Sequence, residues 1–179
     1  MDNNYTDITF VLDESGSMET TKSDTIGGFN SLIKEQIALS NANPNSLALV
    51  SIYTFNGGVH MKCSARPLEG VDLNDRTYVP AGSTALLDAL GVAIKETGQR
   101  LAMTDEKHRP GNVLFVVITD GEENASMRYS RHEIAEMIKT QQDVYKWEFK
   151  FVGANQDVIA NARGLSIAAH DSISYSQTS

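Results

Sequence analysis

The chain has 179 residues, of which 41% are hydrophobic and 21% charged, and it carries a formal net charge of −8 at pH 7. This length indicates a single domain, residues 1–179, that can bury a full hydrophobic core. The acidic balance argues against a nucleic-acid partner, because binding to a phosphate backbone needs clustered Lys and Arg side chains.

The start of the chain and its cysteine content bear on where the protein works. Residues 1–5 contain neither the basic segment nor the apolar segment of a signal peptide. No apolar run approaches the ~20 residues that span a bilayer, so we expect no membrane partner. Cys63 is the only cysteine, which excludes an internal disulfide. We therefore expect a protein of the reducing cytoplasm.

The first predicted element is a strand over residues 7–12, and a polar loop follows it directly. The strand reads as apolar on both faces, which is typical of a central, parallel strand. The loop places Asp13, Ser15 and Ser17 at alternate positions, and Gly16 allows a sharp backbone turn. One carboxylate and two hydroxyls suit a hard cation such as Mg2+, but they fill only about half of its shell. Alone, the pattern also fits a Ser-rich turn or a helix N-cap.

A helix over residues 22–40 is predicted next. One stripe of apolar residues at helical spacing supports it: Ile26, Phe29, Ile33 and Ile37. Gly27 and Gly28 lower the helix propensity of this segment, and we expect them to allow close packing against the sheet.

A hairpin and a long connection follow the helix. Strands over 47–55 and 59–65 flank Asn56-Gly57-Gly58, a hairpin signal that predicts an antiparallel edge strand. Residues 66–83 form a polar connection, and connections of this length are usually functional. The connection delivers Thr84 to the start of a predicted helix over 85–101.

The second half of the chain alternates strands and helices. The apolar strand 113–118 follows a loop over 104–112 and ends in Thr119-Asp120-Gly121. Ser130 and Glu133 form a capping-box signature before a helix over 131–144. A strand over 149–152, a short helix over 156–163, a short strand near 172–175 and a frayed C-terminal tail complete the expected elements. The alternation predicts an α/β fold with a doubly wound, mainly parallel sheet, one antiparallel edge strand and helices on both faces.

This fold predicts that distant polar residues meet at one edge of the sheet. In a parallel sheet, ligands bind at the carboxyl ends of the strands, so Asp13 and Asp120 should lie at the same edge. Thr84, at the start of its helix, can reach that edge too. Taken separately, Asp120 could be a turn residue and Thr84 a helix cap.

Together these segments resemble a von Willebrand factor A-type (vWA, integrin I-like) domain with a complete metal-ion-dependent adhesion site. The resemblance covers about residues 5–165 and rests on Asp13-Glu14-Ser15-Gly16-Ser17, Gly82-Ser83-Thr84 and Thr119-Asp120-Gly121. It implies that the metal residues are Asp13, Ser15, Ser17, Thr84 and Asp120. By this resemblance the two serines contact the ion directly, the two aspartates act mainly through water, and Thr84 joins when the site is engaged. The expected ion is Mg2+, with Mn2+ or Ca2+ as alternatives.

The resemblance also implies a binding function rather than a catalytic one. A cation held mostly by neutral hydroxyls keeps much of its charge, so it should prefer a carboxylate at its open position. We therefore expect a metal-dependent protein-binding module whose partner presents an Asp or Glu. The expected setting is an intracellular interaction or assembly subunit, for example one that docks onto an ATPase.

The main alternative is a Mg2+-dependent phosphohydrolase that uses Asp13. Such enzymes need a second carboxylate two residues on, and here that residue is Ser15, which lacks the charge for acid–base chemistry. The four histidines show no zinc-ligand spacing, and Cys63 is expected to be a buried structural residue. Glu122 and Glu123 are expected on a solvated face rather than among the metal ligands.

Overall fold

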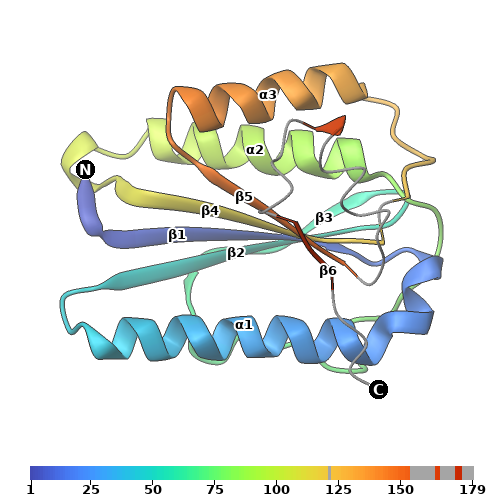
Figure 1. The fold of residues 1–179 in the computed structure, drawn as a ribbon, viewed down its shortest axis with the longest axis horizontal. Coiled ribbons are helices and arrows are strands. Elements are labelled where there is room, and N and C mark those ends of the chain that lie inside the picture. The colour runs from blue at the N-terminus through green and yellow to red at the C-terminus, as the bar shows by residue number, and fades with distance from the viewer. Residues whose placement is uncertain (121, 154–163, 166–171, 175–179) are drawn as a thin grey trace.

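A six-stranded sheet with helices on both faces forms the molecule. The computed structural model describes residues 1–120, 122–153, 164–165 and 172–174. The strands are β1 (Asp2–Asp13), β2 (Leu47–Phe55), β3 (Val59–Pro67), β4 (Pro110–Ile118), β5 (Glu148–Gly153) and β6 (Ser172–Ser174). The helices are α1 (Lys22–Ala42), α2 (Leu86–Ala102) and α3 (Arg131–Asp143), with short 3-10 helices η1 (Gly16–Thr21) and η2 (Glu106–His108). In Figure 1, α1 covers one face of the sheet, and α2 and α3 cover the other.

The strand order places β1 and β4 at the centre of the sheet. The order is β3-β2-β1-β4-β5-β6, and β1 pairs in parallel with both β2 and β4. β3 pairs antiparallel with β2 at one edge, as the hairpin signal predicted. The chain runs outward from β1 on one side and outward from β4 on the other, so these two strands mark the point where the winding direction changes. In open α/β sheets the crevice beyond the strand ends at this point is the usual ligand site.

Two strands are longer than their sequence pattern predicts. β1 begins at Asp2 rather than residue 7, and β4 begins at Pro110, inside the expected loop 104–112. The two extensions support each other: the Asp2 N–H donates to the Arg109 carbonyl, and Asp2 pairs with Pro110 across the ladder. Pairing between distant segments, which has no local periodicity, explains the difference.

The core has two layers, one on each side of the sheet. Alternate residues of β1 divide between them, with Phe10 in the α1 layer and Val11 in the α2–α3 layer. Tyr78, from the connection after β3, is fully buried in the α1 layer. This burial on both faces explains why β1 and β4 read as continuous apolar runs.

The helices confirm the predicted capping and correct one expectation about packing. Ser130 and Glu133 make both hydrogen bonds of the capping box at the start of α3. The expectation that Gly27 allows close packing is wrong, because Gly27 is exposed and a Cβ there would meet nothing within 4 Å. None of the described helices is long and apolar enough to cross a bilayer.

A buried ion pair holds the C-terminal half of α2 against β1. The two terminal guanidinium nitrogens of Arg100, Nη1 and Nη2, donate to the Asp7 carboxylate at 2.8 and 2.9 Å, and the Tyr5 hydroxyl donates to the same group at 3.0 Å. Asp7 is fully buried, so this pairing is what allows its charge to stay inside the fold. Cys63 is free and half-buried rather than fully buried, and burial raises the pKa of its thiol. The predicted helix over 156–163 lies outside the described residues.

Candidate metal centre

Asp13 ends β1 and anchors the loop that follows it. Its carboxylate is fully buried. Oδ1 accepts hydrogen bonds from the Ser15 N–H at 2.9 Å and the Ser15 hydroxyl at 2.5 Å, and Oδ2 accepts one from the Thr119 hydroxyl at 2.7 Å. Since Thr119 directly follows β4, Asp13 ties together the ends of the two central strands. The Tyr78 hydroxyl donates to the Asp13 carbonyl, which fixes the backbone as well.

The hydroxyls of Ser15 and Ser17 lie within hydrogen-bonding distance of each other, close to the separation of neighbouring metal ligands. Their Oγ atoms lie 3.2 Å apart. Adjacent oxygens of an octahedral Mg2+ site, each about 2.0–2.1 Å from the ion, are about 2.9 Å apart, and those around Ca2+ about 3.3–3.7 Å. The Ser15 hydroxyl gives its proton to Asp13, which leaves its lone pairs available to a cation. Ser15 is the N-cap of η1 but makes no side-chain capping hydrogen bond, so it is not a conventional helix cap.

Thr84 is brought to this loop by the end of the connection. The Gly16 N–H donates to the Gly82 carbonyl at 3.0 Å, and the Ala81 N–H donates to the Glu14 carbonyl at 2.9 Å. Thr84 is buried, and it is not the cap of α2, since the N-cap position is Ala85. The interpretation of Thr84 as a helix cap is therefore excluded.

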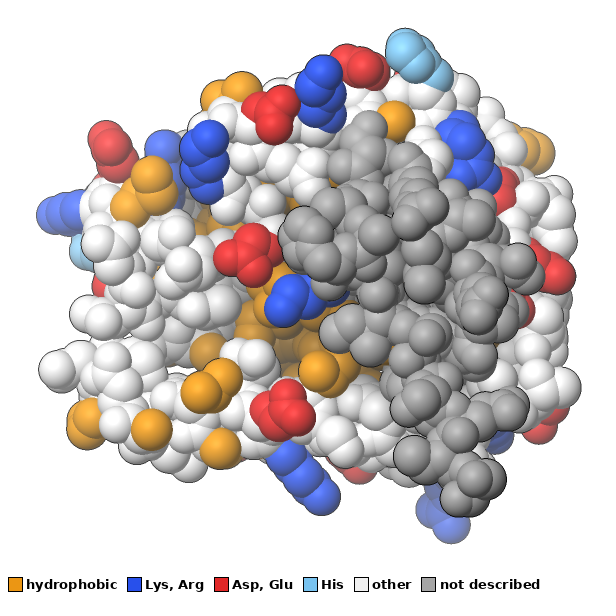
Figure 2. All heavy atoms as spheres, viewed as in Figure 1, with side chains coloured by type: hydrophobic (Ala, Val, Ile, Leu, Met, Phe, Trp, Pro, Cys, Tyr) orange, Lys and Arg blue, Asp and Glu red, His pale blue; other side chains and the backbone are white. Residues whose placement is uncertain are grey.

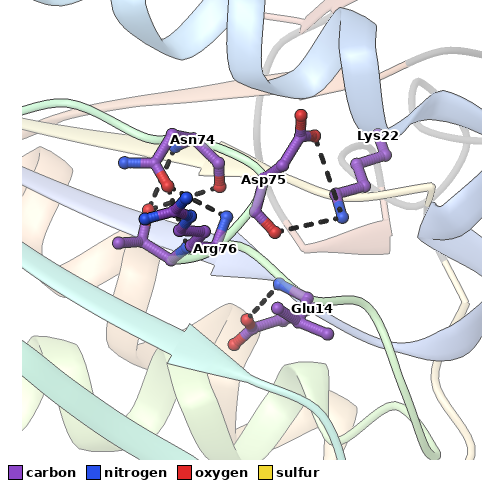
Figure 3. A network of polar contacts seen from close by, with 7 residues as sticks. Glu14, Lys22, Asn74, Asp75 and Arg76 are labelled. Carbon is purple, nitrogen blue, oxygen red and sulfur yellow. Dashed lines mark hydrogen bonds and ion pairs between the residues drawn. The ribbon is translucent and has the colours of Figure 1, made fainter.

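The rest of the connection is held against the same end of the molecule. The Glu14 carboxylate accepts the Val79 N–H at 2.9 Å, and Lys22 at the start of α1 reaches Asp75, with an Nζ to Oδ1 distance of 3.9 Å. Figure 3 shows these contacts, with Glu14 and Lys22 both turned toward the connection. These contacts hold the long polar segment in place and so position Thr84 next to the loop after β1.

Asp120 lies immediately after β4 and Thr119. Its Oδ1 accepts the Glu122 N–H at 3.2 Å, the contact of a local turn. Burial raises the pKa of the Asp13 carboxyl, and the negative charge of Asp120 raises it further, against the lowering effect of the hydrogen bonds from Ser15 and Thr119. A buried carboxylate beside a second negative charge is a suitable environment for a cation, which would offset both the repulsion and the loss of solvation.

The donor set that converges here consists mainly of hydroxyl and carboxylate oxygens. Within the described ranges, His, Cys, Asp and Glu side chains form no group of three or more that could hold a metal ion, so a centre at this edge must use hydroxyls. Hard oxygen donors of this type fit Mg2+ or Ca2+ better than a thiolate- or imidazole-binding ion. The residues present therefore fit a hard divalent cation.

Sequence reasoning missed several residues that shape this edge. Thr119 and Tyr78 both donate hydrogen bonds to Asp13. Thr119 belongs to the Thr119-Asp120-Gly121 motif but was given no role of its own, and Tyr78 does not stand out in the sequence. Glu123 is half-buried and accepts the Leu87 N–H at 3.0 Å, so the expectation of a solvated position is right for Glu122 but wrong for Glu123.

On the face of the molecule shown in Figure 2, Lys and Arg side chains are scattered among acidic ones and do not gather into one basic patch.

Neither a protein-family model nor a curated protein sequence matches the chain. Solved structures do resemble it. Proximal thread matrix protein 1 from the mussel byssus, with a zinc-occupied MIDAS motif, aligns with TM-score 0.59 and 14% identity over 97% of this chain and 42% of that one. The manganese-loaded Plasmodium vivax TRAP protein aligns with TM-score 0.56 and 19% identity over 92% of this chain and 63% of that one. The chain thus spans less than two thirds of either protein. Both are vWA-domain proteins, and the likeness shows that this chain has the vWA fold.

Proposed function

We propose that this chain is a metal-dependent protein-binding module. In this proposal a divalent cation is held by five residues: Asp13, Ser15, Ser17, Thr84 and Asp120. A carboxylate from a partner protein completes its coordination. The observation that carries the proposal is the direct hydrogen bonding of the loop after β1 to both other segments, through Gly16 to Gly82 and through Asp13 to Thr119.

The chemistry of the donor set supports a carboxylate as the partner's ligand. Three of the five residues are neutral hydroxyls, and the two aspartates supply the only formal charge. An ion in this set retains positive charge, and an Asp or Glu oxygen is the hard anionic donor that a protein partner can offer. Nearby acidic residues, including Glu14 and Glu122, favour occupancy by the cation and disfavour partners with dense negative charge.

We propose Mg2+ as the ion, with Mn2+ and Ca2+ as alternatives. The 3.2 Å separation of the Ser15 and Ser17 hydroxyl oxygens falls between the values expected for Mg2+ and Ca2+. The similar structures are described with manganese or zinc, and those ions belong to those proteins.

The burial of Asp13 disfavours the phosphohydrolase alternative. A nucleophilic carboxylate must present an oxygen to its substrate, whereas Asp13 is fully buried and both of its oxygens accept hydrogen bonds from hydroxyl groups. The residue two positions on is Ser15, which has no charge for acid–base work. We therefore propose binding without bond cleavage.

We also propose a cytoplasmic setting, in which the module is a subunit of a larger assembly. The support comes from the single free cysteine, which is typical of a reducing compartment. The partner is defined here only by its chemistry, an accessible Asp or Glu side chain.

An affinity capture tests this function. The immobilised wild-type chain and a Ser15→Ala variant are exposed to lysate of the source organism in Mg2+ and in EDTA. We expect a protein that is retained by the wild type in Mg2+ and released by EDTA, not retained by Ser15→Ala, and no longer bound after substitution of one of its own Asp or Glu residues. Retention that survives EDTA and Ser15→Ala would overturn the proposal. Phosphatase turnover that depends on Asp13 would favour the enzyme instead.

A further inference from the structure

The first turn of α2 is not capped by its own sequence. A helix leaves its first four N–H groups without partners inside the helix, and a Ser, Thr, Asp or Asn at the N-cap commonly satisfies one of them. The N-cap of α2 is Ala85, which has no side chain that can do so. The donors of the first turn must therefore find their partners elsewhere.

The segment after β4 supplies those partners. Glu123 accepts the Leu87 N–H at 3.0 Å, and the Ser126 hydroxyl accepts the Asp88 N–H at 3.0 Å. Ser126 in turn donates its hydroxyl to Glu123 at 2.9 Å, so one short network reaches both donors. A carboxylate at a helix N-terminus is also favoured by the helix dipole.

The α2 helix also accepts hydrogen bonds from the segment after β4, through the Asp88 side chain. This carboxylate is 8% exposed and accepts three backbone N–H groups, from Met127 at 3.0 Å, Arg128 at 2.9 Å and Tyr129 at 3.0 Å. In the described part of the chain no Lys or Arg forms an ion pair with Asp88, so these N–H groups are what stabilises its charge. The arrangement is similar to a capping box, but its two halves come from distant parts of the chain.

Two further contacts complete this unit. The Thr84 N–H donates to the Asn124 side chain at 2.8 Å, and the Thr84 carbonyl accepts the Asn124 N–H at 2.9 Å. The Tyr129 ring lies directly on Gly91 of α2, where an added Cβ would overlap it. We call the joined residues 84–88 and 123–129 the α2 clamp.

We propose that Asp88 and Glu123 are positioning residues of the metal centre, which act by locking the α2 clamp. One half of the clamp begins with Thr84, and the other half begins three residues after Asp120. Locking the two halves together sets the position of Thr84 relative to Asp120 before any ion arrives. This inference rests on the proposed function, because it concerns the affinity of that same site for its ion.

The proposal predicts a large effect from residues that do not touch the ion. Groups that orient metal ligands typically change metal affinity by about 10–100-fold when they are substituted. Glu123→Gln removes one acceptor oxygen of the clamp, and Asp88→Asn places an N–H donor against a backbone N–H. Both should weaken Mg2+ binding within that range, while a purely structural role would lower the free energy of unfolding and leave affinity unchanged.

Isothermal titration of the full chain with Mg2+, repeated with Mn2+, tests this. Glu122→Gln is the matched control, because it removes the same charge one residue away from an exposed side chain. Asp7→Asn is the stability control, since it weakens the buried pair with Arg100 at the other end of α2. We expect weaker affinity in Glu123→Gln and Asp88→Asn than in Glu122→Gln, which loses only the contribution of one nearby charge, and wild-type affinity in Asp7→Asn.

The outcomes separate the two proposals. If the wild type binds and Glu123→Gln and Asp88→Asn match the controls, the positioning role is overturned and the proposed function stands. If the wild type binds neither ion, both proposals are overturned. Should Asp88→Asn fail to fold, Ser126→Ala takes its place, because it removes only the hydroxyl that links the Asp88 backbone N–H to the Glu123 carboxylate. Wild-type affinity in Ser126→Ala and Glu123→Gln would then overturn the role.

Discussion

Gly16 and Gly82 are joined by a backbone hydrogen bond of 3.0 Å, although they belong to different loops at the carboxyl edge of the sheet. Gly82 has φ +85°, a left-handed conformation that residues with a side chain rarely adopt. A Cβ at Gly16 would lie 3.4 Å from the Gly82 carbonyl oxygen. The backbone of the loop after β1 thus fits against the turn that precedes Thr84.

Gly82→Ala should therefore disturb the metal centre as well as the fold. The left-handed conformation costs a residue with a Cβ about 1–2 kcal/mol, so the free energy of unfolding should fall by about that amount. Gly70→Ala is the matched control, because Gly70 has φ +80°, open space around its Cα and no hydrogen bond to the metal loop. Urea unfolding should show similar losses for both, and Mg2+ titration should show weaker binding only for Gly82→Ala. Equal Mg2+ affinity in the two variants would contradict this relationship.

Asp13→Asn should stabilise the metal-free protein near neutral pH. The ordinary pKa of an Asp carboxyl is about 3.8, and the fold raises the pKa of the Asp13 carboxyl above this value, mainly because it is buried. The native state therefore holds this proton more tightly, and the metal-free wild type loses stability as the pH rises from about 3.8 through the folded pKa. Asn can keep an acceptor oxygen toward Ser15 and place its amide N–H as a donor toward the Thr119 hydroxyl oxygen, without the charge.

Urea unfolding in EDTA across this pH range measures the effect. The difference between Asp13→Asn and the wild type should grow as the pH rises and then level off. Added Mg2+ should reverse the order, because only the wild type binds it tightly. A difference that does not change with pH would contradict the account of the Asp13 charge.

Tyr78→Phe tests the other contact that holds Asp13. The Tyr78 hydroxyl donates to the Asp13 carbonyl inside the α1 layer, and a buried carbonyl left without its donor costs about 1–3 kcal/mol. Tyr53→Phe is the control, because Tyr53 donates to Glu96 at 2.7 Å on the other face of the sheet. Both should lower the unfolding free energy, but only Tyr78→Phe should weaken Mg2+ binding. The prediction is wrong if Tyr78→Phe binds Mg2+ as tightly as the wild type.

Local patterns in the sequence accounted for much of this fold. Buried central strands such as β4 read as apolar runs because both of their faces are covered. The start of α3 was predicted because its capping box lies within four consecutive residues, Ser130 to Glu133. The three metal-loop segments were recognisable because each has its own motif in sequence.

Features that depend on pairing between distant segments were not predicted. Residues 2–6 join β1 because Asp2 and Thr6 pair with β4 and because Tyr5 and Thr6 pair with β2, and the polar run 2–4 does not itself indicate a strand. The cap of α2 could not be predicted from the sequence around the start of the helix, because the Ala85 side chain cannot accept a hydrogen bond and Glu123 lies in another segment. The same applies to Tyr78, which reaches Asp13 only once the connection has folded over the α1 layer.

Because Gly27 does not pack against the sheet, replacing it with Ala should stabilise the protein. Gly27 is exposed inside α1, with nothing within 4 Å of an added Cβ. Ala at such a position should raise the free energy of unfolding by about 0.5–1 kcal/mol, because the unfolded chain loses freedom and the helix gains propensity. Urea unfolding should show this gain, with Mg2+ affinity unchanged. A loss of stability would mean that the glycine serves a role that its surroundings do not reveal.

Mg2+-dependent thermal unfolding of a Ser17→Ala variant is the most direct test of the metal centre. Ser17 is exposed and its hydroxyl contacts only Ser15 in the described part of the chain, so its removal should leave the fold intact. Thr20→Ala, which removes another exposed hydroxyl from η1, is the control. At Mg2+ about 100-fold above its dissociation constant, the wild type and Thr20→Ala should melt about 5–10 °C higher than in EDTA. Ser17→Ala should lose most of that shift, and an undiminished shift in Ser17→Ala would contradict the proposed centre.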